Sequence, residues 1–359
     1  MATQPTMWQS LSSFLNLRIA FQQAARGKRS HAAVASFEFE LEENLLKLRD
    51  ELRSGSYQPG QYVNFWIRDP KRRLISAAPF RDRVVHHALC NLIQPVWERR
   101  FVYDSYANRV GKGTHKALDR ATHYLRRFRY VLPLDVRKFF PSVDHAILFK
   151  QLQQGIQDED VLALCAKILS GGEGVLTGEY EMVYFPGDDL LAALRPRGLP
   201  IGNLTSQFWA NVYLNGLDHF IKRRLGVRGY VRYVDDMLLF GDDLQQMHEW
   251  RAAVMDRFAG LRLTVHEGSA QPRPCATGMP FLGFQVFRSH RRLKRRKVVQ
   301  FCRRLRGQLR EYRAGERTQQ QMQASIQGWI HHAQHGDTWG LRTAVRSEER
   351  RVGKECRSR

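Results

Sequence analysis

The feature that most constrains the fold is an Asp-Asp pair enclosed by two short apolar runs, in the segment GYVRYVDDMLLFGDD at residues 229–243. Short β-rich runs on both sides of a break are typical of a β-hairpin. The break contains Asp235 and Asp236, so the sequence predicts a hairpin with both carboxylates at its tip. Burying two like charges there is costly unless one is protonated or a cation is bound. The pattern therefore favours a functional role for this pair.

The chain contains two further Asp-Asp pairs, Asp188-Asp189 and Asp242-Asp243. Each follows a glycine, in PGDDL and FGDDL, and neither lies between apolar runs. Aspartate after glycine is common in turns, so a solvated turn is expected for both pairs.

A third carboxylate is expected close to the hairpin tip. The run RYVLPLD at residues 129–135 is short, β-rich and apolar, and it ends in Asp135 as a buried strand would. Nucleotidyl transfer uses two divalent ions about 4 Å apart. Mg²⁺ binds through one or two carboxylates together with substrate phosphates and water. Asp135, Asp235 and Asp236 on adjacent strands would supply such ligands.

Composition points to a polyanionic partner. The chain has 57 Lys and Arg against 35 Asp and Glu, a net charge of +22. Phosphate neutralisation supplies most sequence-independent affinity for nucleic acid, although a solvated basic surface is the alternative explanation.

The five cysteines form no CxxC pair, which argues against a zinc ribbon or disulfide scaffold. No apolar run approaches the roughly 18 residues of a membrane span, and the N-terminus lacks signal-peptide features, so a soluble cytoplasmic protein is expected.

Periodicity outlines the remaining elements. Helices are expected at 34–54, 83–101 and 205–220, β structure at 62–83 and a strand at 281–287, with a domain boundary near Ser289. From Arg291 the chain becomes Arg-rich and helical, with a second helical stretch around SIQGWIHHAQH. The end of the chain, RSEERRVGKECRSR at 346–359, resembles a translated sequencing adapter and is treated as foreign, so the natural C-terminus is expected beyond about Val345.

Two motifs resemble those of reverse transcriptases. YVDD at 233–236 looks like the family's Tyr-x-Asp-Asp box, and LPLDVRKFFPSVDH at 132–145 is similar to its first catalytic motif. The resemblance implies that Asp135 binds two Mg²⁺ ions, with Mn²⁺ as a possible substitute, and that the Val136 carbonyl assists. It also places Phe140 under the sugar, where the ring would exclude a 2′-hydroxyl; a core aromatic is the alternative.

The resemblance extends from about Leu15 to Val345 and implies an α+β fold, the right-hand polymerase, with an antiparallel palm sheet flanked by helices and a helical thumb. The implied units are an N-terminal extension and fingers at 1–128, a palm at 129–287 with part of the fingers at about 146–184, and a thumb at 288–345.

Further motifs imply substrate contacts. DPKRRLISAAPFRDRVVHHAL resembles the fingers motif that grips the triphosphate, with Lys71 and Arg73 as candidates, a solvated basic loop being the alternative. SYANRVGKGTHKA resembles the next fingers motif, where Arg109 and Lys112 would touch template or nucleotide. FLGFQVF is similar to the primer-grip hairpin. The implied template and primer contacts there and in the catalytic box are Tyr233, Leu282 and Gly283.

One segment points to a subclass. Most reverse transcriptases have Gln-Gly-x-x-x-Ser-Pro where this chain has Ile201-Gly202-Asn203-Leu204-Thr205-Ser206-Gln207, a pattern that resembles diversity-generating retroelements. Such enzymes copy a template-repeat RNA into cDNA, misincorporate opposite template adenines, and work with a small basic helical-bundle accessory protein. Gly202 and Gln207 would lie beside the incoming nucleotide. Arg73, Ile201 and Gln207 are the fidelity candidates, the alternative for Gln207 being a cap or packing residue at a helix start.

The general acid and the functional class stay open at this stage. The stretch LRLTVHEGSAQ at 261–271 has no lysine where many polymerases of this fold place a general acid, and His266 is a candidate donor or an ordinary surface histidine. The histidine pairs at 86–87 and 331–332 are not expected to be metal sites, because neither has a third ligand at plausible spacing and both lie in helical stretches, which favours packing or solvent exposure. Rival functions are a reverse transcriptase of the intron, retron or phage-defence type, and a non-catalytic RNA-binding scaffold.

Overall fold

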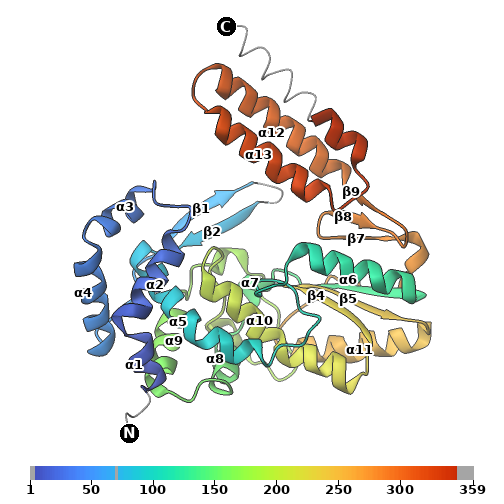
Figure 1. Ribbon diagram of the computed structural model, residues 1–359. Helices are drawn as coiled ribbons and strands as arrows, with labels where there is room; N and C mark the ends of the chain where they lie inside the picture. Colours follow the sequence, from blue (N-terminus) through green and yellow to red (C-terminus); the bar gives the residue numbers. More distant parts are fainter. Residues whose placement is uncertain (1–4, 69–71, 346–359) are drawn as a thin grey trace.

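The computed structural model describes residues 5–68 and 72–345 (Figure 1). The N-terminal part is helical, with α1 (Met7–Leu11), α2 (Phe14–Ala25), α3 (Ala32–Phe39) and α4 (Leu41–Arg53). The single helix expected at 34–54 is therefore two helices. The chain leaves the helical conformation at Glu40, which has φ −113° and ψ 44°. These helices pack on α5 (Phe80–Glu98) through a shared apolar core.

A two-stranded hairpin stands at the edge of this helical part. It pairs β1 (Val63–Ile67) with β2 (Arg73–Ala77) in antiparallel register, which confirms the β structure expected there. All five residues of β1 are exposed, whereas Ser76 in β2 is fully buried. The hairpin is thus held to the rest of the protein through the end of β2.

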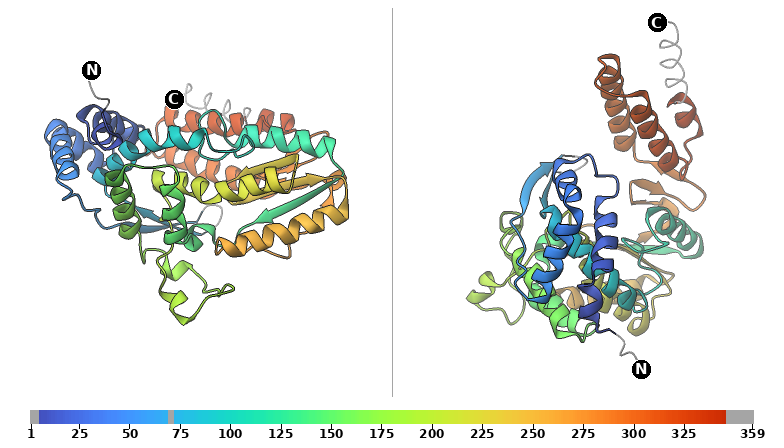
Figure 2. Two further views of the ribbon diagram at one scale, coloured as in Figure 1. Left: turned by 90° about the horizontal axis from the view of Figure 1, so that it is seen from below. Right: turned by 60° about the vertical axis from the view of Figure 1, so that its left-hand side comes forward.

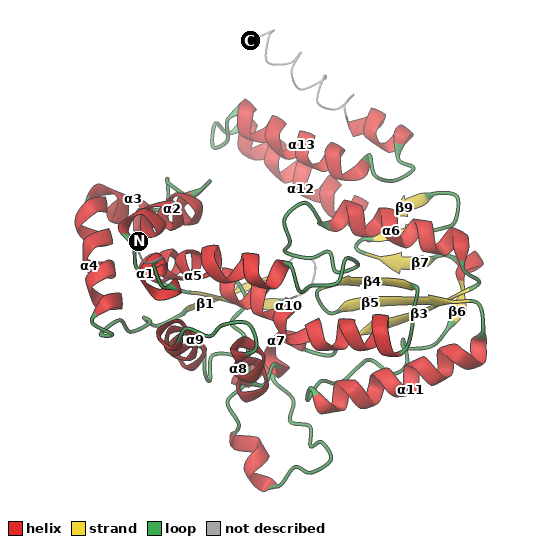
Figure 3. Cartoon of the chain, turned by 60° about the horizontal axis from the view of Figure 1, so that its bottom comes forward, coloured by secondary structure: helices red, strands yellow, loops and turns green. Residues whose placement is uncertain are grey.

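A four-stranded antiparallel sheet forms the centre of the molecule, in the order β4-β5-β3-β6. Its strands are β3 (Tyr130–Asp135), β4 (Gly229–Tyr233), β5 (Asp236–Gly241) and β6 (Arg273–Pro274). Figure 3 shows the sheet between α6 (Thr114–Arg127) on one side and α11 (Leu244–Gly260) on the other.

Alternating side chains cover both faces of this sheet, as the two-residue period of a strand requires. One set packs on α6: Val131, Val231, Leu238 and Phe240. The other set joins the large core that includes α10 (Leu204–His219) and α11: Leu132, Leu134, Tyr230, Met237 and Leu239. Because both faces are buried, a one-residue slip of register would exchange the two sets, which fixes the position of every residue at the strand ends.

Short helices connect these elements. They are α7 (Phe139–Ser142), α8 (His145–Gln153), α9 (Glu159–Gly171), η1 (Thr177–Glu179), η2 (Leu190–Leu194) and the π-helical η3 (Phe220–Arg224), with η4 (Cys275–Thr277) after β6. No helix in the described part of the chain has the length and apolar character that crossing a bilayer requires.

The C-terminal part begins with a three-stranded sheet, in which β8 (Phe284–Val286) pairs with β7 (Met279–Phe281) and β9 (Arg291–Leu293). The expectation of a single strand at 281–287 is wrong, because the turn at Leu282 and Gly283 divides it between β7 and β8. Arg291–Leu293 is therefore a strand, and the helical character expected from Arg291 starts at α12 (Arg295–Arg313). The β8–β9 turn lies at the position of Ser289. Helix α12 packs against α13 (Gln319–Ala333) around the stacked rings of Phe301 and Trp329, whose centroids are 4.1 Å apart.

Histidines join this C-terminal part to the central one. The ring of His115 in α6 stacks on His335, just after α13, with centroids 3.4 Å apart and an interplanar angle of 13°. His332 lies 5.8 Å from His115. Burial, together with the neighbouring imidazoles, lowers the pKa of both His115 and His332 below the ordinary value of 6.5. The lowered pKa values mean that this contact is more stable when His115 and His332 are neutral.

We expect acid to loosen this contact. Because the pKa values are lowered in the folded state, the histidine contribution is complete above about pH 6.5 and is lost as pH falls through the lowered values. His335→Asn removes one of the stacked rings and should flatten the dependence of Tm on pH between about 5 and 7.5. His248→Asn changes an exposed histidine of α11 and is the control. Equal pH profiles for the two variants would contradict this role.

Candidate active site

The β4–β5 hairpin brings the predicted carboxylates together. Asp135, the last residue of β3, lies directly opposite Asp236, the first residue of β5, and Tyr233 lies opposite Asp236 on its other side. Directly opposed residues of antiparallel strands have Cα atoms about 4.5–5.5 Å apart. Val234 and Asp235 form the two-residue turn between the strands. The predicted hairpin, with an Asp-Asp pair at its tip, is confirmed as a structural element.

The turn itself adopts an uncommon backbone conformation. Val234 has φ +57°, in the left-handed region that β-branched residues rarely occupy. Residues held in such conformations cost on the order of 1–3 kcal/mol and persist where the surroundings determine them. The structure supplies such surroundings on the face of the sheet opposite Asp135 and Asp236.

A buried ion pair supports the turn from that face. Arg232 and Asp218 are both 0% exposed, and the guanidinium binds the carboxylate in bidentate fashion at 2.7 and 2.6 Å. Arg232 also donates to the carbonyl of Val234 at 3.1 Å and to the side-chain oxygen of Asn211 at 3.0 Å. Burial, with Asp218 beside it, raises the pKa of Tyr230, whose hydroxyl stays protonated and donates to Asp218 at 2.7 Å. This network fixes the turn that carries Asp235.

The sequence contains a signal for this network, in charged residues at positions where the pattern is otherwise uncharged. Arg232 interrupts the apolar strand GYVRYV, and Asp218 is the only Asp, Glu, Lys or Arg in the helix 204–219. Charged residues at such positions are seldom buried unless they are paired.

The donor set suits a hard divalent cation. Asp135, Asp235 and Asp236 are partly buried, and like charges directly opposite each other destabilise a sheet unless a cation compensates them. The described residues contain no group of three or more His, Cys, Asp or Glu side chains placed to hold a metal by themselves. A site that takes few carboxylates and fills its coordination with substrate phosphates and water does not require one.

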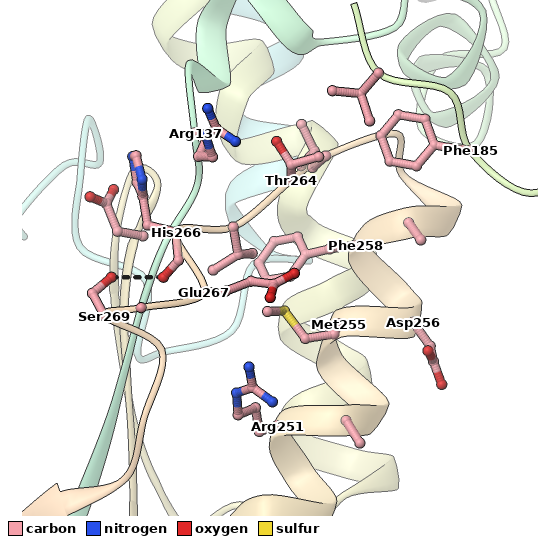
Figure 4. A pocket seen from close by; sticks show the side chains of 17 residues that line it. Arg137, Phe185, Arg251, Met255, Asp256, Phe258, Thr264, His266, Glu267 and Ser269 are labelled. Atoms are coloured by element: carbon pink, nitrogen blue, oxygen red, sulfur yellow. Dashed lines mark hydrogen bonds between the residues drawn. The ribbon is translucent and has the colours of Figure 1, made fainter.

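A cleft opens beside the end of β3, with a volume of about 1060 Å³ (Figure 4). Val136 pairs with Val265, the amide of Arg137 donates to Thr264, and the amide of His266 donates to the carbonyl of Asp135 at 3.0 Å. Figure 4 shows the side chains of Arg137 and His266 toward one end of the cleft and Arg251 of α11 toward the other. The candidate proton donor His266 is thus exposed and adjacent to Asp135 in space.

A single segment, 198–203, links the chain after β3 to the outer hairpin. The amide of Gly198 donates to Val143, and that of Leu199 donates to Phe140, both at 2.8 Å. The carbonyl of Ile201 accepts from the amide of Ser76 in β2, also at 2.8 Å. The segment therefore joins two regions that carry predicted nucleotide contacts.

The nucleotide-binding candidates lie around this segment. Arg73 opens β2 and is exposed, and Gln207 is exposed in the first turn of α10. Phe140 is partly buried and meets Phe139 edge to face at 5.4 Å. Gly202 has φ +119°, and a Cβ there would approach Ile75 to 3.0 Å, so both conformation and space favour glycine. Lys71 lies outside the described residues.

Arg109 and Lys112 are engaged within the protein. The guanidinium of Arg109 is 6% exposed, pairs with Glu98 at 2.7 Å and donates to the carbonyls of Val102 and Ser105. Its donors are used internally, which argues against the template or nucleotide contact expected for it. Lys112 donates to the carbonyl of Tyr103 at 2.8 Å and lies 3.2 Å from the centroid of that ring.

The expected primer contacts surround a second cleft, of about 640 Å³, between α6, the β7–β8 turn and the C-terminal helices. Thr114 lines this cleft and donates to the hydroxyl of Tyr233 at 3.0 Å. Leu282 and Gly283 line it too, and they form the β7–β8 turn with φ +46° and +89°. The cleft also contains Lys297 and Arg304 of α12.

The expectation of a solvated turn holds for only one of the two outer Asp-Asp pairs. Asp242 and Asp243 are exposed, and Asp243 caps α11. The side chain of Asp188, in contrast, is 1% exposed and binds Arg195 at 2.7 Å and Arg262 at 2.6 Å. These contacts hold the loop 180–197, which projects from the body in Figure 2, against the segment that follows α11. The expectation for Asp188 was wrong because its partner Arg262 is distant in sequence.

Breaking the buried ion pair should destabilise the whole fold. Asp218→Asn leaves the Arg232 guanidinium buried without a counter-charge, a change that typically costs about 3–5 kcal/mol. Asp119→Asn removes an ion pair with Arg291 in which Asp119 is 63% exposed, and should cost less than about 1 kcal/mol. Urea unfolding measures both. A cost for Asp218→Asn no larger than that of the control would argue against the network.

Comparison with known proteins gives the family. The family described as reverse transcriptase (RNA-dependent DNA polymerase) matches residues 68–286, more than half of the chain. The chain is similar to Protein YkfC of Escherichia coli K12, with 29% identity over 184 residues that cover 49% of this chain and 45% of that protein. It is also similar to the group II intron-encoded protein LtrA of Lactococcus lactis, with 25% identity over 183 residues, 50% of this chain and 28% of LtrA.

Among solved structures, a telomerase from Candida albicans in complex with a fragment of telomeric RNA matches with a TM-score of 0.44 and 12% identity, covering 67% of this chain and 46% of that one. The matched regions span less than half the length of the two curated relatives. The family match contains β3 and the whole β4–β5 hairpin with their three aspartates, and the chain belongs to the reverse transcriptase family.

Proposed function

We propose that the protein is an RNA-directed DNA polymerase that extends a primer with deoxynucleoside triphosphates on an RNA template. The observation that carries the proposal is the direct pairing of Asp135 with Asp236, beside Asp235 at the turn, within the region that matches the family. The positive net charge of +22 supports a nucleic-acid substrate.

In the proposed enzyme, Asp135, Asp235 and Asp236 hold two Mg²⁺ ions with help from the carbonyl of Val136. Ions held there would supply Lewis-acid chemistry, lowering the pKa of the primer 3′-hydroxyl and stabilising charge on the leaving phosphates. Arg73, with Lys71, binds the triphosphate, and Phe140 lies under the sugar. The Val136 carbonyl is one residue from Asp135, and Phe140 is tied through Leu199 to the segment that contacts β2.

We assign the central sheet to a polymerase palm within 129–287, which also contains part of the fingers at about 146–184. We assign the N-terminal helices and the β1–β2 hairpin to an N-terminal extension and fingers within 1–128, and α12 and α13 to a thumb within 288–345. The primer strand then passes through the cleft lined by Leu282, Gly283, Lys297 and Arg304. Basic side chains on α12 and small residues on α13 suit a phosphate backbone lying close to the helices.

Neutralising a carboxylate should abolish synthesis without unfolding the protein. Asp135→Asn and Asp236→Asn each remove an expected metal ligand, and primer extension on RNA with Mg²⁺ should fall by more than about a hundredfold. Asp243→Asn is the matched control, because asparagine caps a helix as well as aspartate does. Primer extension that survives in Asp236→Asn, or that persists in EDTA, would refute the assignment.

We further propose that the enzyme belongs to a diversity-generating retroelement and copies template adenines inaccurately, together with a small basic accessory protein. The support is the segment from Ile201 to Gln207, which has glutamine in place of proline and lies between Phe140 and the β1–β2 hairpin. A conventional intron-type reverse transcriptase is the second candidate, favoured by the similarity to LtrA, an intron-encoded protein.

An error spectrum separates the two candidates. Sequencing cDNA made on a defined RNA should give errors concentrated opposite template adenines. Gln207→Pro should lower the errors at adenine more than those at the other bases, because proline removes a flexible donor and acceptor. Errors spread evenly over the four template bases would favour the intron-type enzyme and refute the retroelement assignment.

A further inference from the structure

Asn203 occupies the N-cap of α10 but does not cap it. Asparagine at this position usually accepts a hydrogen bond from the backbone of the first helical turn. The side chain of Asn203 makes no such bond. It is 2% exposed, and its polar atoms turn instead toward β2 and the preceding loop.

The amide of Asn203 joins three backbone groups. Its nitrogen donates to the carbonyls of Ser76 at 2.9 Å and Pro200 at 3.1 Å, and its oxygen accepts from the amide of Ala78 at 3.2 Å. Beside it, the amide of Ser76 donates to Ile201 at 2.8 Å. Three hydrogen bonds therefore cross between residues 76–78 and residues 201–203, all of them at buried or partly buried positions.

Steric contact reinforces this junction. Gly202 lies so close to β2 that a Cβ would come within 3.0 Å of Ile75. On the far side of the hairpin, β1 is exposed along its whole length. The position of the hairpin is therefore determined at the junction, and a displacement of the junction moves every residue of β2, including Arg73.

We propose that Asn203 is a positioning residue that sets the distance between the Arg73-bearing hairpin and the segment Ile201–Gln207, and thereby controls nucleotide selection. This inference rests on the proposed polymerase activity. Only an amide side chain meets the requirement, because the two carbonyls need a donor and the Ala78 amide needs an acceptor. Aspartate has nearly the same shape but offers acceptors alone, so it would face two carbonyls without a proton to share.

The first test measures selection. Asn203→Asp should raise KM for the incoming nucleotide about tenfold, because the loss of one or two buried hydrogen bonds corresponds to a change of that size in a binding constant. The value of kcat should change less. The error spectrum on the same RNA should change as well. Asn16→Asp is the matched control, since Asn16 is also buried and its side chain also makes three hydrogen bonds, to Leu11, Ala88 and Asn91 in the helical part. Asn203→Ser should lie between wild type and Asn203→Asp, because a hydroxyl can accept from the Ala78 amide but has only one proton for the two carbonyls.

The second test does not depend on activity. Hydrogen exchange of the amides of Ser76 and Ala78 should quicken in Asn203→Asp and remain unchanged in Asn16→Asp. A variant with wild-type KM, wild-type errors and wild-type exchange at 76–78 would overturn the proposal. So would equal changes in KM and errors for Asn203→Asp and Asn16→Asp, because that result would indicate general destabilisation. A wild-type protein that fails to extend primers would instead refute the proposed function, and the exchange measurement would still decide the positioning role.

Discussion

The buried pair of Arg232 and Asp218 is the interaction on which the site depends most directly. A charge at 0% exposure is tolerated only when its donors and acceptors are satisfied, and here the guanidinium is bound by Asp218, Asn211 and the Val234 carbonyl. The last bond reaches the strained turn itself. Arg232 projects from one face of the sheet, while Asp135 and Asp236 belong to the other, so the support does not compete with the carboxylates for space.

A second constraint acts across the chain rather than within the sheet. The segment 198–203 binds the residues after β3 on one side and the end of β2 on the other. Neither neighbour is close to it in sequence, and the contacts are made chiefly by backbone groups. Since such buried groups must be paired, the segment has little freedom to move without disturbing both neighbours. The arrangement transmits the position of the Phe140 region to the β1–β2 hairpin.

The sequence predicted what local patterns encode. The apolar runs around Asp235-Asp236 and before Asp135 predicted the hairpin and the strand, because alternation and length are local properties. It did not predict partners that are distant along the chain. Asp188 was expected in a solvated turn, but in the structure it binds Arg262, which is distant in sequence. Arg109 was expected to contact substrate, but its guanidinium donates to Glu98 and to two backbone carbonyls. The break at Glu40 was missed because the apolar period continues through it.

The two constraints differ in how they can be varied. Changes in the buried Arg232 network threaten the fold, since an unpaired interior charge is costly, and they are therefore poor routes to altered specificity. The junction at Asn203 is held by a few neutral hydrogen bonds, each worth about 1 kcal/mol, next to a hairpin with an exposed strand. Discrimination between similar substrates by the shape of a pocket also amounts to about 1–3 kcal/mol. In the proposed enzyme, accuracy can thus be tuned at the junction by amounts that leave the supports of Asp135, Asp235 and Asp236 intact.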